Sequence, residues 1–258
     1  MHPKIRFRVV LLFCILHFAL CIAHPQDNFC NIRNTSFKPG EVLNFKVYYS
    51  MAGFWVKAGT ASFTVEQTSY NNIPVYHIVG KGKTASSYEW FYKVDDTYET
   101  WLDIQTLQPL KFSRNVREGS TRFQEAIFFQ GGTVVTKKGC YATPKCVQDV
   151  LSAIYFARNI DYSKYRPGDK IPFNLFLDNE LYKTHITFLG RDKVSFKSGI
   201  YHTIMISPKL FEGTIFKGGE KMTVWVSDDQ NKIPLRIETP ITVGSIVVEL
   251  ISFQNLRN

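Results

Sequence analysis

Gly139–Asp161 reads GCYATPKCVQDVLSAIYFARNID and holds the one convincing helical pattern downstream of the N-terminus. Apolar residues recur there at the spacing of one helix face, which predicts an amphipathic helix. These residues are Val147, Val150, Leu151 and Ile154. Asp149 near the start and Arg158 near the end carry the charges that the helix dipole favours at those positions. We expect the four apolar side chains to point toward the core.

Both flanks of this stretch carry the alternation that is typical of half-buried β-strands. Between Leu43 and Tyr49 every second residue is apolar, and similar short runs follow as far as Lys137. Asn71-Asn72 and Gly131-Gly132 separate consecutive runs as tight turns. The chain is therefore expected to be mainly β and to consist of antiparallel meanders.

The two flanks also resemble each other in the order of their landmarks. Phe37-Lys-Pro-Gly-Glu41 returns as Tyr165-Arg-Pro-Gly-Asp169, and Trp101 returns as Trp225, 124 positions later. Two related meander halves joined by one amphipathic helix predict a curved sheet or an open barrel, with the helix over one mouth or over the concave face. Two unrelated meanders that share turn chemistry, or two separate small barrels, are the alternatives.

The N-terminus has the parts of a secretory signal peptide. Lys4, Arg6 and Arg8 precede an apolar run over residues 9–20, and the predicted cleavage site follows Ala23. A membrane anchor is the alternative, but the run is shorter than the roughly 20 residues that span a bilayer. Lipidation at Cys21 is disfavoured because a bulky leucine precedes it. No later stretch is long and apolar enough to span a membrane.

We divide the chain into a signal peptide (1–23), a first β-rich half (24–138), a loop with the connecting helix (139–164) and a second β-rich half (165–258). Together the last three form one domain. Removal of the signal peptide lowers the formal net charge from +9 to +6. No dense basic cluster with interleaved aromatic residues is present, so a nucleic-acid partner is not expected.

Three cysteines remain after the signal peptide. Cys140 and Cys146 flank a proline-containing loop, which in an exported protein predicts a local disulfide. Cys30 is then a free thiol, or it pairs with one of the other two. The spacing of these cysteines does not match a redox CxxC motif, and no further ligands at metal-binding spacing accompany them.

Two C-terminal stretches resemble a large family of exported bacterial proteins known as domain of unknown function 3108. They are KMTVWVSDDQNKIPLR (residues 221–236) and VGSIVVEL (residues 243–250). The helix segment Gln148–Arg158 and the opening Pro39-Gly40-Glu41-x-Leu43 are similar to the same family. The resemblance implies a mostly β protein in the periplasm, or at the outer-membrane periphery, of a Gram-negative bacterium. It implies no activity, and it carries over no catalytic residue.

The sequence holds no Gly-x-Ser-x-Gly, His-Glu-x-x-His, P-loop or Gly-x-Gly-x-x-Gly motif, and we predict no cofactor and no metal site. His77 and His202 occupy equivalent positions in the two halves, either as acid–base or metal groups or as histidines at the sheet rim. Asp228-Asp229 is either a carboxylate pair for glycoside chemistry or a hairpin turn that aspartate favours.

The aromatic run Ser87-Tyr88-Glu89-Trp90-Phe91-Tyr92 cannot be buried as a whole, because consecutive strand residues face opposite sides. It points to a ligand cavity, a sugar platform or a partner interface. On the helix, Tyr155 and Arg158 are placed either to hold a polar head group or to lock the helix to the sheet. The candidate ligand-binding residues are therefore Trp90, Tyr88, Tyr155 and Arg158.

The leading functional hypothesis is non-enzymatic binding of an apolar or amphipathic ligand, or of another envelope component, in a concave β surface. The partner would be a lipid-like ligand or an envelope polymer or protein. One alternative is an enzyme acting on envelope glycan, with Asp95, Asp96 or Asp228 as acid and base. Another is a structural or adaptor protein.

Overall fold

The computed structural model describes residues 32–90, 92–196, 199–209, 222–241 and 243–258. The predicted signal peptide and Cys30 lie outside these residues. The first half of the chain contributes β1 (Val42–Met51), β2 (Phe54–Tyr70), β3 (Ile73–Thr84), β4 (Asp95–Asp103), β5 (Pro109–Glu118), β6 (Thr121–Phe129), β7 (Thr133–Thr136) and β8 (Gly139–Ala142). The second half contributes β9 (Lys170–Leu177), β10 (Glu180–Phe196), β11 (Gly199–Pro208), β12 (Thr223–Ser227), β13 (Pro234–Pro240) and β14 (Ser245–Gln254).

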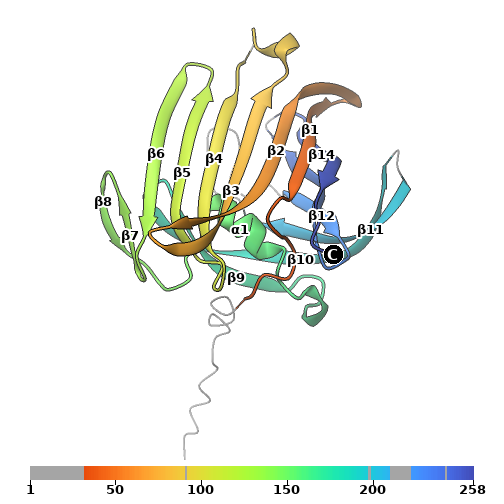
Figure 1. Ribbon diagram of the computed structural model, residues 1–258. Helices are drawn as coiled ribbons and strands as arrows, with labels where there is room; N and C mark the ends of the chain where they lie inside the picture. Colours follow the sequence, from red (N-terminus) through yellow and green to blue (C-terminus); the bar gives the residue numbers. More distant parts are fainter. Residues whose placement is uncertain (1–31, 91, 197–198, 210–221, 242) are drawn as a thin grey trace, which may run out of the picture.

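All of these strands belong to one antiparallel sheet of 14 strands, in which each half is a meander. The first strand of the chain, β1, pairs with the last, β14, and this pairing joins the two meanders into one surface. β8 and β9 are the two outer edges. Figure 1 shows the sheet curving around the helix α1 (Val150–Ala157), with β9 and β10 crossing below it. The mainly β fold predicted from the sequence, a curved sheet of two meander halves joined by one helix, is confirmed.

The two halves are also equivalent in their backbone contacts. Gly40 adopts a φ of 87° and donates a hydrogen bond to Val65 O at 2.7 Å, whereas Gly168 adopts a φ of 97° and donates to Phe188 O at 2.8 Å. Both glycines follow a proline. Their hydrogen bonds attach the start of the first half to β2 and the start of the second half to β10. A side chain is disfavoured at such a φ, which explains why each turn carries a Pro-Gly pair.

Short turns set the register of the long hairpins. Asn71-Asn72 joins β2 to β3 with φ values of 50° and 64°, and Asp178-Asn179 joins β9 to β10 with φ values of 52° and 66°. Two successive residues with positive φ define the turn whose twist matches that of the flanking strands, and asparagine and aspartate tolerate this conformation best. The prediction of a tight turn at Asn71-Asn72 is confirmed.

The helix α1 begins at Asp149, which is its N-cap and is fully buried. Its carboxylate accepts hydrogen bonds from Leu151 N and Ser152 N, and Ser152 Oγ accepts one from Asp149 N, so the two residues form a capping box. Thr100 of β4 donates a further hydrogen bond to Asp149 at 2.7 Å. The helix start is thereby attached to the first half of the sheet.

The structure corrects the apolar stripe predicted for this helix. Val147 precedes the first helical residue, and Ile154 is 37% exposed instead of pointing into the core. The inward face is formed by Leu151, Ser152, Tyr155 and Phe156. Val147 is buried as predicted but precedes the cap at Asp149, and the prediction failed for Ile154 because periodicity identifies an apolar face without showing what covers it. Gly139–Ala142, expected to be part of a loop, forms the edge strand β8.

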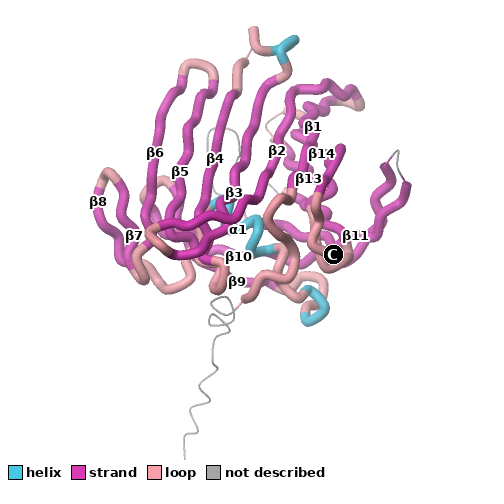
Figure 2. The backbone as a smooth tube through the Cα atoms, in the orientation of Figure 1, coloured by secondary structure: helices cyan, strands magenta, loops and turns pink. Residues whose placement is uncertain are grey.

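The helix fills the lower part of the concave face and packs against both halves. Leu151 and Tyr155 lie in a core cluster with apolar residues of the first half, and Phe156 lies in a cluster with apolar residues of the second half. Figure 2 shows the helix between these two groups of strands. Because each half buries its inner face on the helix, neither half has a complete core alone.

The end of the helix is fixed by a buried ion pair. Arg158 is 2% exposed, and its guanidinium donates to both carboxylate oxygens of Glu41, at 2.6 and 2.8 Å. It also donates to the carbonyl oxygens of Asn231 and Ser36. The aromatic ring of Tyr155 lies 5.1 Å from the guanidinium. One side chain therefore joins the helix, the start of β1 and the turn before β13.

The chain ends strengthen the same junction. Ser36 Oγ donates a hydrogen bond to Arg158 O at 2.6 Å, and Asn258 exchanges hydrogen bonds with Asn231. Asn255 donates to Gly40 O at 2.9 Å. The described N-terminal segment and the C-terminus thus lie side by side near the end of the helix, and Figure 1 marks the C-terminus to the right of the helix.

The predicted local disulfide is wrong. Cys140 is a free, exposed thiol at the edge strand β8, whereas Cys146 is disulfide-bonded. Cys140 lies within a paired hairpin strand and Cys146 lies beyond it, next to Gln108 of the first half. Sequence proximity therefore did not identify the bonded pair.

Removing one partner of the buried ion pair should destabilise the protein strongly. For Glu41→Gln we expect a loss of about 3–5 kcal/mol of unfolding free energy, because the Arg158 cation stays buried without its counter-ion. Urea denaturation measures this loss. Asp228→Asn is the matched control, since it breaks the partly exposed pair with Arg191 and should cost less than about 1 kcal/mol. Equal losses in the two variants would contradict the role assigned to Arg158.

The helix cap should make stability depend on pH. Burial raises the pKa of Asp149 from 3.8 to about 6, although four hydrogen bonds oppose the shift. The folded protein then holds a proton that the unfolded chain releases. This stabilising contribution, about 2–3 kcal/mol, is complete below about pH 4 and lost as the pH rises through 6. Asp149→Asn should remove it, so the stability difference between wild type and variant should fall between pH 4 and 6. A constant difference would contradict the assignment.

Candidate functional site

The concave face stays open above the helix, and we call this space the inner trough. Its main part is a cavity of about 750 Å³. The start of β2 and the end of β3 line this cavity, and both lie at the end of the sheet away from the C-terminus (Figure 1). Apolar and small side chains of β1, β2, β3 and β14 line it. They include Val47, Tyr49, Val56, Ala61, Gly82 and Ile246. A volume of this size falls in the range of roughly 300–1,000 Å³ that is typical of small-molecule sites.

The trough is open because its floor carries almost no side chains. On the inner face of β2 and β3, Ala61 lies opposite Gly82. A Cβ atom added at Gly82 would meet nothing within 4 Å. By contrast, a Cβ at Gly80 would come within 2.9 Å of the Phe63 ring. Gly80 therefore serves packing under the helix, whereas Gly82 leaves space unfilled.

A smaller cavity of about 280 Å³ extends the trough down to the helix. Gly82 lines both cavities, and Ile154 of the helix and Tyr98 of β4 line the lower one. The exposed side of the helix is therefore the bottom of the trough, which explains why Ile154 is not in the core. An apolar residue in this position covers the core below and offers an apolar surface above.

The aromatic run between β3 and β4 overhangs the open end of the trough. Tyr88 lies in the short helix η2 (Ser86–Tyr88), and Tyr88, Trp90 and Tyr92 all line the main cavity. Trp90 is 82% exposed, and its indole Nε1 donates to Ser87 O at 3.0 Å. Tyr92 packs beside Gly119 of the next turn. Two of the candidate residues predicted from the sequence, Trp90 and Tyr88, therefore lie at this site.

The other two predicted candidates lie elsewhere. Tyr155, on the inward face of the helix, and Arg158, at its C-terminal end, are buried in the core. Neither residue lines any part of the trough. Arg158 is occupied by Glu41, and burial raises the pKa of Tyr155 well above its ordinary value. The contacts correspond to the alternative in which these residues lock the helix to the sheet.

One wall of the trough is polar. Asp96 of β4 is nearly buried, lines the lower cavity and accepts a hydrogen bond from Arg117 N at 2.8 Å. Burial and the adjacent Asp96 carboxyl, which shares a hydrogen bond with Glu118, raise the pKa of Glu118. Burial and Asp96 also raise the pKa of Tyr98. From the sequence, Asp96 is predicted only as a catalytic carboxylate, because no local pattern connects it with Glu118.

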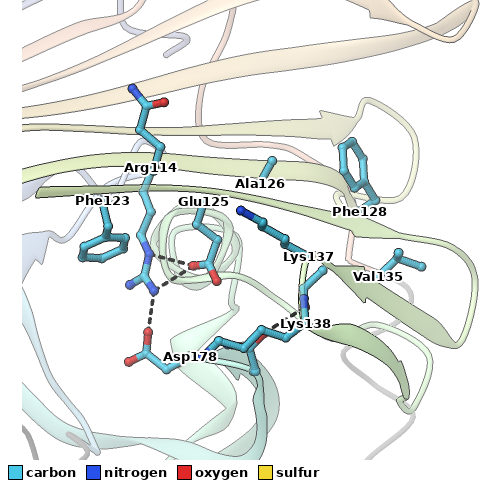
Figure 3. A pocket seen from close by; sticks show the side chains of 12 residues that line it. Arg114, Phe123, Glu125, Ala126, Phe128, Val135, Lys137, Lys138 and Asp178 are labelled. Atoms are coloured by element: carbon cyan, nitrogen blue, oxygen red, sulfur yellow. Dashed lines mark hydrogen bonds and ion pairs between the residues drawn. The ribbon is translucent and has the colours of Figure 1, made fainter.

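Arg114 of β5 connects the two halves of the sheet where β5 approaches the β9–β10 turn. Its guanidinium pairs with Glu125 at 2.7 Å and with Asp178 in the β9–β10 turn, as Figure 3 shows. Beside it, Thr136 donates a hydrogen bond to Asn179 at 2.8 Å. A second cavity, of about 730 Å³, lies at this contact. Its central charged groups already pair with one another, so we regard it as the space between two sheet parts and not as the ligand site.

Three further chemical candidates, Asp228, Asp229 and His77, have structural partners. Asp228 pairs with Arg191 at 2.9 Å, and Asp229 accepts backbone hydrogen bonds from Asn231 and Lys232, which is the predicted hairpin turn. His77 contacts Glu99 at 2.8 Å, stacked on Trp101. The part of the chain that the structure describes contains no group of three metal-ligating side chains. Nor does any helix within it have the length and apolar character needed to cross a membrane.

The fold is that of an open, barrel-like sheet with one helix inside it. The family model for the protein of unknown function DUF3108 matches residues 44–251, and the chain belongs to that family. The resemblance predicted from the sequence is therefore confirmed. A comparison with curated proteins finds no match.

Two solved structures are similar to the chain. A β-barrel-like protein of the family DUF1849 from Brucella abortus has a TM-score of 0.56 and 10% sequence identity, over 86% of this chain and 99% of the other. At this identity the likeness shows the fold alone. A "putative exported protein with YmcC-like fold" from Bacteroides fragilis has a TM-score of 0.35 and 10% identity, over the same shares of the two chains, and supports no argument.

The two glycines of the trough should respond oppositely to alanine. Gly80→Ala should lower the unfolding free energy by about 1–3 kcal/mol, because its methyl group would overlap the Phe63 ring. Gly82→Ala should leave stability unchanged or raise it by up to about 1 kcal/mol, because the new methyl group meets open space and the unfolded chain loses freedom. Urea denaturation of both variants tests this. A similar loss in both would show that the trough floor is filled.

Proposed function

We propose that this protein is a non-enzymatic binding protein of the cell envelope that holds an apolar or amphipathic ligand in the inner trough. The observation that carries the proposal is the open cavity of about 750 Å³, with apolar walls and an unobstructed floor at Gly82. Soluble proteins seldom leave such a surface uncovered without a use, since burying apolar area against a ligand is favourable by about 25 cal/mol per Å².

The shape of the trough favours an elongated ligand. The main and lower cavities share Gly82, so a chain could run from the aromatic overhang at Trp90 to Ile154 of the helix. Asp96 stands at one wall of this path, with the Glu118 carboxyl beside it. Carboxyl oxygens accept hydrogen bonds and repel anions, so this wall fits a hydroxyl or amine head group better than a phosphate. An amphipathic molecule would place its apolar chain against the apolar lining and its head group near Asp96.

The glycan-enzyme alternative receives less support. Asp96 and Glu118 are in hydrogen-bond contact, whereas glycosidases keep their two carboxyls roughly 5–10 Å apart so that a sugar carbon or a water fits between them. Asp228 is held by Arg191 outside the trough. Export to the envelope, proposed from the predicted signal peptide, gives an amphipathic ligand a lipid source nearby.

Filling the trough should weaken ligand binding without unfolding the protein. Gly82→Leu projects a side chain into the space where nothing lies within 4 Å of a Cβ atom. We expect it to weaken binding of the fluorescent fatty acid cis-parinaric acid by at least about tenfold, the effect of displacing one well-packed apolar segment. Fluorescence titration measures the affinity, and thermal unfolding verifies the fold.

Ser62→Leu is the matched control for this experiment. Ser62 is the neighbour of Ala61 on β2 and faces the opposite side of the sheet, because successive strand residues alternate. It should bind cis-parinaric acid as the wild type does. Equal affinity of a folded Gly82→Leu protein and the Ser62→Leu protein would refute binding in the trough.

A further inference from the structure

The open end of the trough is surrounded by exposed apolar side chains that do not line its cavities. Three segments meet there: the β1–β2 turn, the aromatic run before β4 and the β13–β14 turn. Met51 and Phe54, which flank the first turn, are 44% and 74% exposed, and Val243 of the third is 57% exposed. We call these three residues, with the overhanging Trp90, the apolar rim.

Contacts between the segments show that the rim is one surface. Tyr49 Oη donates a hydrogen bond to Val243 O at 2.9 Å and lies 3.4 Å from Met51 Sδ. Trp90 lines the same cavity as Ile241 of the β13–β14 turn and Tyr49, which lies in β1 next to the β1–β2 turn. Figure 1 places the β1–β2 turn and the segment between β3 and β4 at the same end of the sheet.

The conformation of the first turn exposes its apolar residues. Ala52 and Gly53 adopt φ values of 49° and 83°, which makes a tight two-residue hairpin between Met51 and Phe54. Met51 and Phe54 are a cross-strand pair at the tip, beyond which the sheet has no further residue to cover them. Polar residues would be the ordinary choice at such a tip in water, so the pair requires another explanation.

The charges of the rim segments favour an anionic surface. In residues 51–58 and 85–94 the charged side chains are Lys57, Glu89 and Lys93. Glu89 pairs with Lys93 at 3.1 Å, which leaves Lys57 as the uncompensated charge. Aromatic residues flanked by lysine are typical of protein surfaces at the boundary between lipid head groups and acyl chains.

From this arrangement we infer that the apolar rim is a membrane-docking surface, which inserts Met51, Phe54 and Trp90 into an anionic lipid bilayer. The inference rests on the proposed function for its purpose: a sparingly soluble ligand would pass from the bilayer into the trough through the end that the rim surrounds. Because Met51 and Phe54 do not line the cavities, docking and ligand binding can be separated by substitution.

The test measures co-flotation of the purified protein with vesicles of phosphatidylglycerol and phosphatidylethanolamine. The double variant Met51→Ser, Phe54→Ser should bind vesicles at least about tenfold more weakly than wild type, because large apolar side chains no longer enter the bilayer. Its affinity for cis-parinaric acid in solution should be unchanged. All proteins compared carry the same N-terminal segment, so differences between them report the rim.

Two control variants complete the design. Phe253→Ser removes a ring that is 48% exposed at the other end of β14, next to Leu43 instead of the trough mouth, and it should float with vesicles as wild type does. Gly82→Leu should also float normally while losing cis-parinaric acid. Equal flotation of the rim variant and Phe253→Ser, or no flotation of the wild type, would overturn docking whatever the ligand titrations give. Rim-dependent flotation of a wild type that binds no cis-parinaric acid would uphold docking and refute the proposed function.

Discussion

The buried pair of Arg158 and Glu41 is the interaction on which the arrangement of this protein depends. It joins the end of the helix to the start of β1, and β1 is the strand that pairs with β14 to unite the two meanders. Two charges out of water are costly unless each is paired and hydrogen-bonded, and here the guanidinium has four hydrogen-bonded contacts. The pair fixes one position of the helix on the concave face, because few other positions would let both charges keep their partners.

That position decides what the concave face can do. The Asp149 cap ties the helix start to Thr100 of the first half, and Arg158 ties its end to the junction of the halves. The helix thus covers the lower face only, and its outward residue Ile154 becomes the bottom of the inner trough. Above it, Ala61 and Gly82 leave the sheet almost without side chains. A helix held higher, or larger residues on β3, would close this space and yield an ordinary filled core.

Much of this fold could be predicted from the sequence. Strand alternation, the paired Pro-Gly turns and the single helical pattern were sufficient for a curved sheet of two related halves. The site could be predicted only in part. The run around Trp90 was recognisable because adjacent aromatic residues cannot all be buried, but Gly82 was not, since a glycine within a strand indicates equally a bulge, a close approach or an empty floor. Only the folded structure shows that it faces an open cavity.

The residues that were misjudged share one cause. Arg158 and Tyr155 carry groups suited to a ligand, but their partners Glu41 and Phe37 are distant in sequence. Cys140 and Cys146 were predicted to form a disulfide because they are close in sequence, but Cys140 is free and Cys146 is bonded elsewhere. Ile154 appeared to be a core residue because periodicity identifies an apolar face without showing what covers it. Long-range contacts, not local pattern, separate the core of this protein from its site.

Native mass spectrometry of the protein recovered after export, followed by organic extraction, tests the central claim most directly. The account predicts a population with added mass equal to one apolar or amphipathic molecule per chain, which extraction removes while the fold remains. A single mass equal to the bare polypeptide, together with no extractable ligand and no uptake of added lipid, would contradict the claim that the inner trough is a ligand-binding site.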